Sequence, residues 1–281
     1  MSHLQDQIDR VPFWWHSIDV GGIVTPGLIP EDQQQKILRN IRLPDLKGKT
    51  VLDIGTYDGF FAFEAERRGA SRVVALDHYV WERQIDKCIA YWQECNKTGT
   101  SPIAAEFDQF IDRVNLPGKA AFDTARRLLN SRVEPLVADF MAMDIRELGQ
   151  FDVVLYLGVL YHMTDPLGAL TRVAQVTKEM AIIETAAMRV EGQDDLSLFE
   201  FYPENQLGND FSNWWSPNDV ALTGLCRAAG FRHFELLHEP VKPASPYRRL
   251  RRRVGDILKG REREKITRYR AIAHATKLPK T

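Results

Sequence analysis

The stretch VLDIGTYDG, residues 51–59, decides which fold the chain is expected to adopt. The apolar run Thr50–Ile54 predicts a short strand, and the residues after it predict a helix over 57–69. Gly55 and Gly59 let the backbone between them turn tightly and approach a ligand closely. The first turn of the helix then points free N–H groups into the crevice beside the strand end. The stretch therefore predicts a strand, a ligand-binding turn and a helix.

Strands and helices alternate along the rest of the chain. Apolar runs predict further strands at residues 72–76, 135–138, 151–157, 180–184 and 231–237, the last of which is expected to be the final strand. Helical patterns are expected at residues 80–96, 121–129, 166–177 and 217–229. The strand at 151–157 is nearly all apolar, as is typical of a strand buried on both faces. This alternation predicts an α/β fold with a doubly wound, mostly parallel sheet.

Three acidic residues accompany the first three expected strands. Asp77 ends the second strand, 22 residues after Gly55, where a carboxylate can bind both hydroxyls of a ribose. Asp139 follows the third strand, where it could meet an adenine amino group. Asp53, two residues before Gly55, distinguishes the pattern from the G-x-G-x-x-G of dinucleotide folds. Aspartates at strand ends also cap helices, but three of them in register predict a nucleoside-containing cofactor.

The composition is that of a soluble globular protein. Of the 281 residues, 44% are hydrophobic and 27% are charged, so the chain can bury a sizeable core. No apolar run approaches the roughly 20 residues that cross a bilayer, and residues 1–10 lack the apolar core of a signal peptide. Three cysteines are too few for a disulfide framework or a zinc cluster. We therefore expect a cytoplasmic protein without a metal site. The alternative is a metal site formed by Glu191 and Asp194-Asp195.

Charge is unevenly distributed along the chain. Residues 242–281 carry 14 Lys or Arg and 3 Asp or Glu, a net charge of +11, whereas residues 1–241 carry a net charge of −12. The basic run at 248–253 could bind nucleic acid, an anionic lipid surface or an anionic glycan. Alternatively, it forms a solvated helix on the acidic body or on a partner subunit. The expected organisation is an N-terminal cap or lid (1–45), a cofactor-binding domain (46–240, with an insertion at about 97–133) and a basic tail (241–281).

Together these features resemble a class I S-adenosylmethionine-dependent methyltransferase. Residues 53–59 resemble the first motif of that superfamily, Asp77 its ribose-binding acid, Asp139-Phe140 its adenine-side motif and residues 151–162 its fourth strand. The resemblance implies a Rossmann-like, seven-stranded sheet, here with an N-terminal helical cap and a basic C-terminal appendage, and S-adenosyl-L-methionine as the cofactor. The cofactor-binding residues that it implies are Asp53, Gly55, Thr56, Tyr57, Gly59, Asp77, His78, Asp139, Phe140 and Leu157.

Several shorter stretches are similar to the tRNA wobble-uridine carboxymethyltransferase family. They are residues 15–19, 158–162, 165–167, 184–185 and 213–217. That family uses a carboxylated form of the cofactor and carries basic residues in its N-terminal segment and just after the Tyr-His pair. Here VPFWW occupies residues 11–15, and Met163-Thr164 follows His162. Because a buried carboxylate needs a cationic or hydrogen-bonding partner, we expect plain S-adenosylmethionine and methyl transfer.

Methyl transfer needs an acceptor atom in line with the sulfonium methyl group and, for an oxygen of high pKa, a base that removes its proton. His162 follows the fourth strand beside the expected methyl donor and is the predicted base, unless it only bonds a backbone carbonyl. Tyr161 is expected to touch the cofactor or orient the acceptor, or else to pack. His16 could close over the site as a second base or be a packed histidine. Glu184 could bind an acceptor hydroxyl or a cation, or cap a turn.

Aromatic residues outside the regular alternation indicate either an apolar acceptor pocket or a core under a long loop. They are Phe13, Trp14, Trp15, Trp214 and Trp215, with Asp210 and Asn213 nearby as polar groups.

Three functional classes follow from these observations. The leading prediction is an enzyme that transfers a methyl group to a small-molecule or glycan acceptor, at oxygen. The alternative is a tRNA-modifying enzyme that holds phosphates with its basic tail, although an acidic body argues against it. A non-catalytic cofactor-binding scaffold is the third class, and the intact motif at 53–59 together with Asp77 argues against it.

Overall fold

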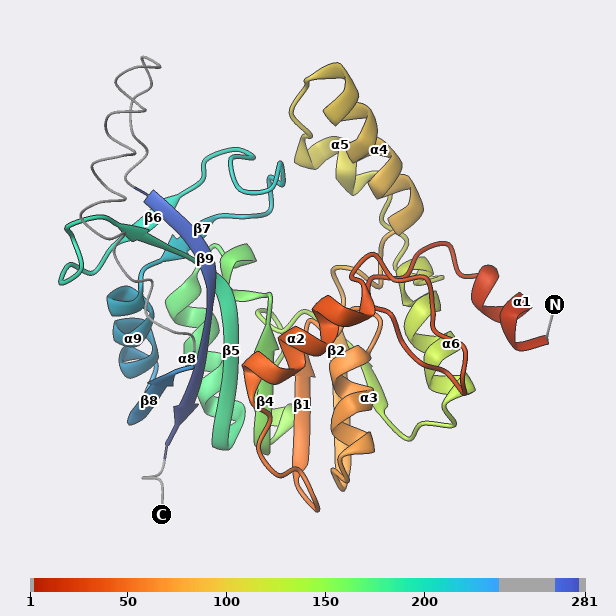
Figure 1. The fold of residues 1–281 in the computed structure, drawn as a ribbon, viewed down its shortest axis with the longest axis horizontal. Helices are drawn as coiled ribbons and strands as arrows, with labels where there is room; N and C mark the ends of the chain where they lie inside the picture. The colour runs from red at the N-terminus through yellow and green to blue at the C-terminus, as the bar shows by residue number, and fades with distance from the viewer. Residues whose placement is uncertain (1–2, 238–265, 278–281) are drawn as a thin grey trace.

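A seven-stranded sheet forms the centre of the molecule (Figure 1). The computed structural model describes residues 3–237 and 266–277. The strands are β1 (Thr50–Ile54), β2 (Arg72–Asp77), β3 (Glu134–Val137), β4 (Phe151–Leu157), β5 (Thr177–Val190), β8 (His233–Leu236) and β9 (Ile266–Thr276). They lie in the order β3-β2-β1-β4-β5-β9-β8, and β9 is antiparallel to both of its neighbours while the pairs from β3 to β5 are parallel. The predicted α/β fold with a mostly parallel, seven-stranded sheet is confirmed.

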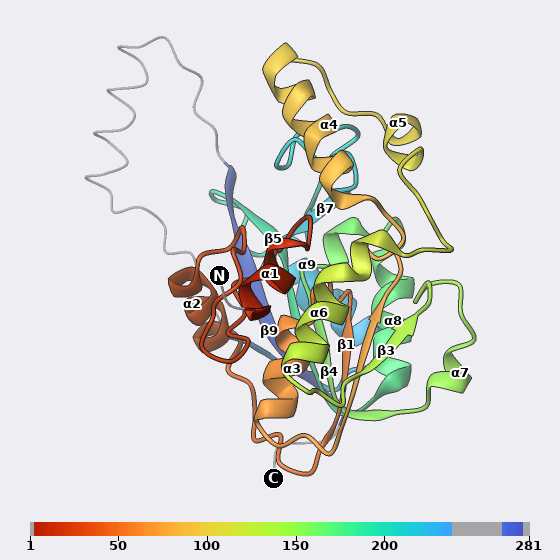
Figure 2. The same cartoon turned by 90° about the vertical axis from the view of Figure 1, so that its right-hand side faces the viewer.

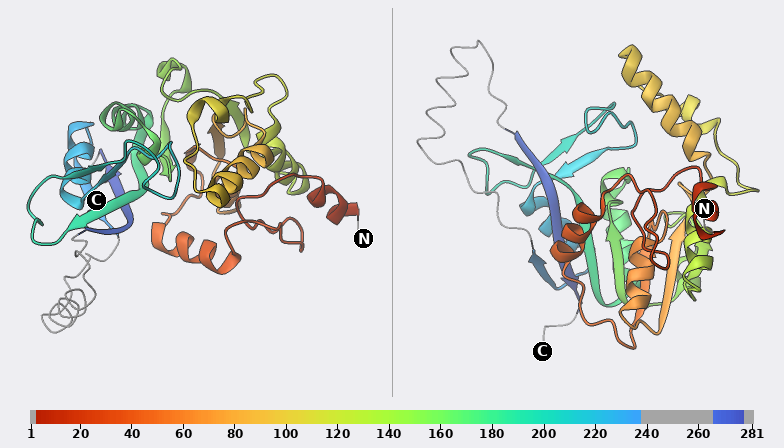
Figure 3. Two further views of the ribbon diagram at one scale, coloured as in Figure 1. Left: turned by 90° about the horizontal axis from the view of Figure 1, so that it is seen from above. Right: turned by 45° about the vertical axis from the view of Figure 1, so that its right-hand side comes forward.

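Helices cover both faces of the sheet because successive side chains of a strand point to opposite faces. Val51 and Val153 face one hydrophobic core, whereas their neighbours Leu52 and Val154 face the other. The first core is closed by α2 (Glu31–Ile41), α3 (Phe60–Arg67) and α6 (Ala120–Leu128), and the second by α8 (Pro166–Val176) and α9 (Asp219–Ala228). Figure 3 shows these layers from two further sides.

Smaller elements extend from this body. The helix α1 (His3–Asp9) joins α2 in the N-terminal segment, and α7 (Ile145–Leu148) precedes β4. The helices α4 (Ile85–Thr98) and α5 (Ala104–Asp108) form an arm that projects beyond the carboxyl ends of the parallel strands (Figure 2). The short strands β6 (Phe199–Phe201) and β7 (Trp215–Pro217) pair with each other outside the main sheet. The described helices are all too short or too polar to span a bilayer.

Two predicted helices begin later than expected. The helix predicted over 57–69 begins at Phe60, because Tyr57 and Gly59 have positive φ angles of 56° and 86° and belong to the turn. The helix predicted over 80–96 begins at Ile85, because the preceding residues fold back on Asp77, whose Oδ1 accepts the Val80 N–H at 3.0 Å. In both cases the turn that follows the strand includes residues that the sequence pattern assigned to the helix.

The prediction that residues 231–237 form the final strand was wrong. The final described strand is β9, which lies between β5 and β8 and pairs with β5 from Thr276 to Ile266. The assignment of 241–281 as a basic tail therefore fails for residues 266–276, where every residue from Ala271 onward is buried. The prediction failed because the charge count over forty residues masked this short run of small apolar residues. The basic run at 248–253 lies outside the described residues.

The strand predicted at 180–184 is also much longer, since β5 covers Thr177–Val190. Its pairing with β9 continues to the Val190–Ile266 pair, well past the end of β4 at Leu157. An antiparallel neighbour thus supplies backbone partners for the part of β5 that extends beyond the parallel sheet.

A buried carboxylate fastens the N-terminal segment to the turn after β1. We call residues 11–29 the strap. The Oδ2 atom of Asp58 accepts the N–H groups of Trp15 (3.0 Å) and His16 (2.7 Å), and its Oδ1 lies 2.6 Å from His16 Nδ1. Because Asp58 is fully buried, its contacts with Trp15 and His16 replace the hydrogen bonds that water would make to an exposed carboxylate. Gln34 of α2 holds the other side of the strap through the N–H and C=O groups of Ser17.

Replacing Asp58 with Ala should lower the free energy of unfolding by about 2–4 kcal/mol, because two main-chain N–H groups and a buried histidine lose their acceptor together. Urea denaturation followed by circular dichroism measures the change. Asp195→Ala, at an exposed position, is the matched control and should stay within about 0.5 kcal/mol of the parent. A similarly small change for Asp58→Ala would show that the strap is not fastened by this carboxylate.

Candidate functional site

The turn after β1 is held against the end of β2 by main-chain hydrogen bonds. The N–H groups of Gly55 and Thr56 both donate to the C=O of Leu76, at 2.8 and 3.2 Å. A Cβ on Gly55 would lie 2.6 Å from Val159 Cγ2, and one on Gly59 would lie 2.6 Å from ring carbons of Phe63 and Phe122. Such distances are far below van der Waals contact, so both positions need glycine, as the motif predicts.

Two buried carboxylates flank this turn. Burial raises the pKa of Asp53 to about 7, and the Thr56 hydroxyl, which donates to it at 2.6 Å, partly opposes the rise. Burial also raises the pKa of Asp77, against hydrogen bonds from the N–H groups of Tyr57 and Val80 at 3.0 Å each. Each Asp77 oxygen keeps a lone pair beyond these bonds. The structure thus places Asp77 at the edge of the turn.

Tyr57 has an unusual conformation, since a positive φ is uncommon for a bulky residue. Its C=O accepts the Trp81 indole N–H at 2.6 Å, and its ring stacks on Trp15 of the strap at 5.3 Å between centroids. Phe13 lies 6.4 Å from the same ring. Of the predicted aromatic pocket residues, Phe13 and Trp15 therefore meet at the turn, whereas Trp14 is buried in the hydrophobic core.

The ends of β2 and β3 bring further predicted residues together. His78 Nε2 lies 3.8 Å from Asp139 Oδ1, and both side chains are partly exposed. Asp139 also accepts the N–H of Met141 at 2.8 Å, so its carboxylate is held in place. Phe140 does not join them through its side chain, because it is buried in the core beneath, 6.5 Å from the Tyr156 ring.

The residues after β4 form a second group. Leu157 ends the strand and is partly buried, and the Gly158 N–H donates to the C=O of Glu184 at 2.9 Å. Tyr161 and His162 follow in a short 3₁₀ turn, Leu160–His162, with their rings 4.2 Å apart. Burial lowers the pKa of His162 and raises the pKa of Tyr161. A neutral imidazole is the form that can accept a proton.

Arg270 of β9 is a site residue that the sequence reasoning missed. Its guanidinium forms an ion pair with Glu184 and lies 4.8 Å from the centre of the Tyr161 ring. A Cβ on Gly158 would lie 3.6 Å from both Arg270 Nη2 and Tyr161 Oη, so these groups surround one small space. No strong signal for its strand exists in the sequence, because the apolar residues that follow Arg270 are mostly small and basic residues surround them.

His16 occupies a different place from His162. It is buried in the strap against Asp58, and its ring stacks on Phe60 at 5.1 Å and meets the edge of Phe61 at 5.5 Å. These contacts join it to α3 behind the turn. Its role as a second base stays a prediction.

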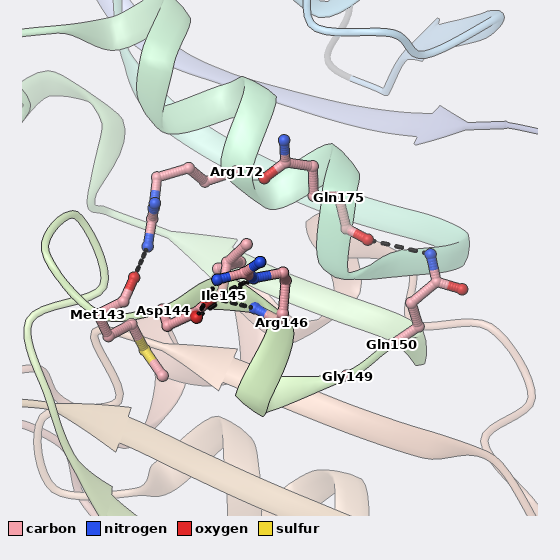
Figure 4. Close-up of a pocket in the computed structure, with 8 residues that line it drawn as sticks. All are labelled: Met143, Asp144, Ile145, Arg146, Gly149, Gln150, Arg172 and Gln175. Atoms are coloured by element: carbon pink, nitrogen blue, oxygen red, sulfur yellow. Dashed lines mark hydrogen bonds and ion pairs between the residues drawn. The ribbon is translucent and has the colours of Figure 1, made fainter.

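A surface pocket lies apart from these groups, between α7 and α8 (Figure 4). Its two arginines are already engaged, since Arg172 donates to the C=O groups of Phe140 and Met143 and Arg146 pairs with Asp144. None of the predicted site residues lines it. In the part of the chain that the structure describes, no group of three or more His, Cys, Asp or Glu side chains is arranged to hold a metal ion.

Comparison with known proteins adds curated relatives. The tRNA U34 carboxymethyltransferase of Campylobacter lari is 25% identical over 215 residues, which cover 74% of this chain and 59% of the relative. The enzyme of the same name from Marinobacter nauticus is 26% identical over 191 residues, 68% of this chain and 46% of the relative. The chain therefore spans about half the length of the curated relatives it matches.

Solved structures and a family model identify the fold and the family. The N-terminal domain of EvdMO1, solved with SAH and D-fucose, has a TM-score of 0.55 at 18% identity and covers 98% of this chain and 97% of that chain. At this identity the likeness shows a shared fold. The family model described as "Methyltransferase domain" matches residues 30–236. The predicted Rossmann-like fold is confirmed, the predicted methyltransferase family is confirmed, and the chain belongs to the methyltransferase domain family.

Proposed function

We propose that the chain transfers the methyl group of S-adenosylmethionine to an oxygen atom of a small-molecule or glycan acceptor. The observation that carries this proposal is the position of two groups of residues, the turn at 55–59 and the Tyr161-His162 pair. The turn at 55–59 and the Tyr161-His162 pair follow β1 and β4, which are neighbours in the sheet. The strand order changes direction between these two strands, and ligands of open α/β sheets bind at such a point.

The cofactor would lie across the ends of β1, β2 and β3. Asp77 would accept hydrogen bonds from the ribose hydroxyls, and the glycine turn would approach the methionine part of the cofactor. Asp139, with the main chain of Phe140, would face the adenine, with His78 beside it. Asp53 would position Thr56, whose hydroxyl donates a hydrogen bond to it. Leu157 would make apolar contact with the cofactor.

The acceptor would lie on the β4 side, beside Tyr161 and His162. The cofactor would supply the methyl carbon to the acceptor oxygen and leave as a neutral thioether, and His162 would take the acceptor proton. Tyr161 would orient the acceptor, and Arg270 holds Glu184 beside it. A cytoplasmic location remains part of this proposal.

A second candidate function is carboxymethyl transfer to tRNA. The observation that favours it is the position of Arg270. Its guanidinium lies next to Tyr161 and could pair with the additional carboxylate of the carboxylated cofactor. Two observations support the first candidate instead. Arg270 is already paired with Glu184, and the first 241 residues carry a net charge of −12, which disfavours a polyanion.

Asp77→Ala should weaken the binding of S-adenosylmethionine by about 10- to 100-fold, because a carboxylate that accepts two hydroxyls contributes about 1.5–3 kcal/mol. Isothermal titration calorimetry measures the dissociation constant. Asp144→Ala is the control, since that aspartate pairs with Arg146 outside the proposed site. Unchanged affinity in a folded Asp77→Ala protein would remove the ribose role.

His162→Ala should lower methyl transfer by about 10²- to 10⁴-fold, the usual range for loss of a general base. Its affinity for S-adenosylmethionine should change less than about 3-fold. The assay follows label from the methyl group of the cofactor into the small-molecule and the tRNA fractions of a cell extract. Equal losses of transfer and of cofactor affinity would contradict the base assignment, and label in the tRNA fraction would favour the second candidate.

Calorimetry with S-adenosylmethionine, S-adenosylhomocysteine and carboxy-S-adenosylmethionine on one preparation should show preference for the first two. Arg270→Gln should leave the affinity for S-adenosylmethionine within about 3-fold, because the plain cofactor lacks the additional carboxylate that the carboxylated form has on the transferred carbon. If the carboxylated form binds more tightly and Arg270→Gln removes that preference, carboxymethyl transfer becomes the leading function.

A further inference from the structure

The loop before β7 contacts both the arm and the Tyr161-His162 turn. We call residues 205–213 the roof loop. It approaches α4 and α5 (Figure 1), where the Phe211 ring lies 5.3 Å from Phe107 and 6.3 Å from Trp92. The N–H of Trp214, the residue after the loop, donates to the C=O of Tyr161 at 2.8 Å. The chain is thus fixed at two points, one just before and one just after Ser212.

The roof loop determines which nitrogen of His162 carries the proton. The Nδ1 atom of His162 lies 3.0 Å from the main-chain oxygen of Ser212 and 3.0 Å from its hydroxyl oxygen. A carbonyl oxygen can only accept, so Nδ1 must be the donor in the neutral ring. The lone pair of the neutral imidazole is then on Nε2, and Nε2 is the atom that can take a proton.

Asp210 holds Ser212 in the position that this bond needs. The Oδ1 atom of Asp210 accepts the Ser212 N–H at 2.8 Å and the Ser212 hydroxyl at 2.7 Å. Because the hydroxyl proton is given to Asp210, the hydroxyl oxygen too can act only as an acceptor toward His162 Nδ1. Both oxygens of Ser212 therefore favour the same tautomer of His162.

From this arrangement we infer that Asp210 is a positioning residue, which acts through Ser212 to keep the neutral His162 ring protonated on Nδ1 and unprotonated on Nε2. The inference rests on the proposed function in that it gives His162 Nε2 the role of the accepting atom. The packing of Phe211 on the arm then links the position of α4 and α5 to the orientation of the base.

The charged and titratable groups around His162 come from four elements. Asp210 of the roof loop stabilises the protonated ring, and Arg270 of β9, which is paired with Glu184 of β5, destabilises it. Tyr161 contacts the ring from the same turn. Loss of the Asp210 charge should therefore favour the neutral ring.

The test is long-range ¹H–¹⁵N correlation spectroscopy on the full chain labelled with [¹⁵N]histidine, recorded from pH 4.5 to 8. It needs neither acceptor nor cofactor. The signals of His162 are assigned by their loss in His162→Gln. The wild-type ring should be Nδ1-protonated when neutral. Asp210→Asn keeps an acceptor oxygen but removes the charge, so it should retain this tautomer and weaken proton binding to His162 by about 3- to 10-fold.

Asp210→Ala should lose both effects and give a mixture of the two tautomers, while Asp195→Asn should match the wild type. An Nε2-protonated ring in the wild type would overturn the inference. So would unchanged tautomer and proton affinity in both Asp210 variants. If Asp210→Ala fails to fold, Asp210→Asn still decides the charge effect, and Ser212→Gly removes the hydroxyl contact alone. Failure of these tests leaves cofactor binding by calorimetry unaffected, so it can be told apart from failure of the proposed function.

Discussion

The turn at residues 55–59 is the constraint on which the rest of the structure depends. Two acceptors at the end of β2, the Leu76 carbonyl and the Asp77 carboxylate, bind N–H groups of the turn, and a third acceptor, the Asp58 carboxylate of the turn itself, binds N–H groups of the strap. Each is in or beside the strand ends that form the site. The N-terminal segment packs over the turn because its own N–H groups find their acceptor there. The turn after β1 and the strap are therefore joined in one buried hydrogen-bonded unit.

The second half of the site depends on an antiparallel strand. Pairing with β9 extends β5 beyond the parallel sheet and places Glu184 opposite Ile272, two residues along from Arg270. Arg270 forms an ion pair with Glu184, and its guanidinium lies 4.8 Å from the centre of the Tyr161 ring. A parallel strand at the same place would require a long crossover connection. The Glu184–Arg270 ion pair beside Tyr161 thus depends on the one strand that reverses direction within the described sheet.

The sequence could predict the parts of the fold that depend on local pattern. The apolar run 151–157 and the glycines of the first turn correctly predicted the parallel core and the tight turn after β1. The assignment of Asp77 to the cofactor stays a prediction. The sequence could not predict β9, since Ala271, Ala273 and Ala275 are small residues whose burial depends on neighbours far away in the chain. For the same reason, Arg270 was counted with the tail. The Asp58–His16 and Asp210–Ser212–His162 contacts join segments whose proximity no periodicity reveals.

The place of β9 in the sheet also has a consequence for how the chain folds. In the described structure β8 has hydrogen bonds in the main sheet only with β9, although β9 follows it by almost thirty residues. During synthesis, the strands from β3 to β5 can pair as soon as they emerge, whereas the open edge of β5 stays unpaired until residue 276 has left the ribosome. An unpaired strand edge of this length is a template for association with other chains. The nascent protein is therefore most exposed to aggregation between the emergence of β5 and the emergence of β9.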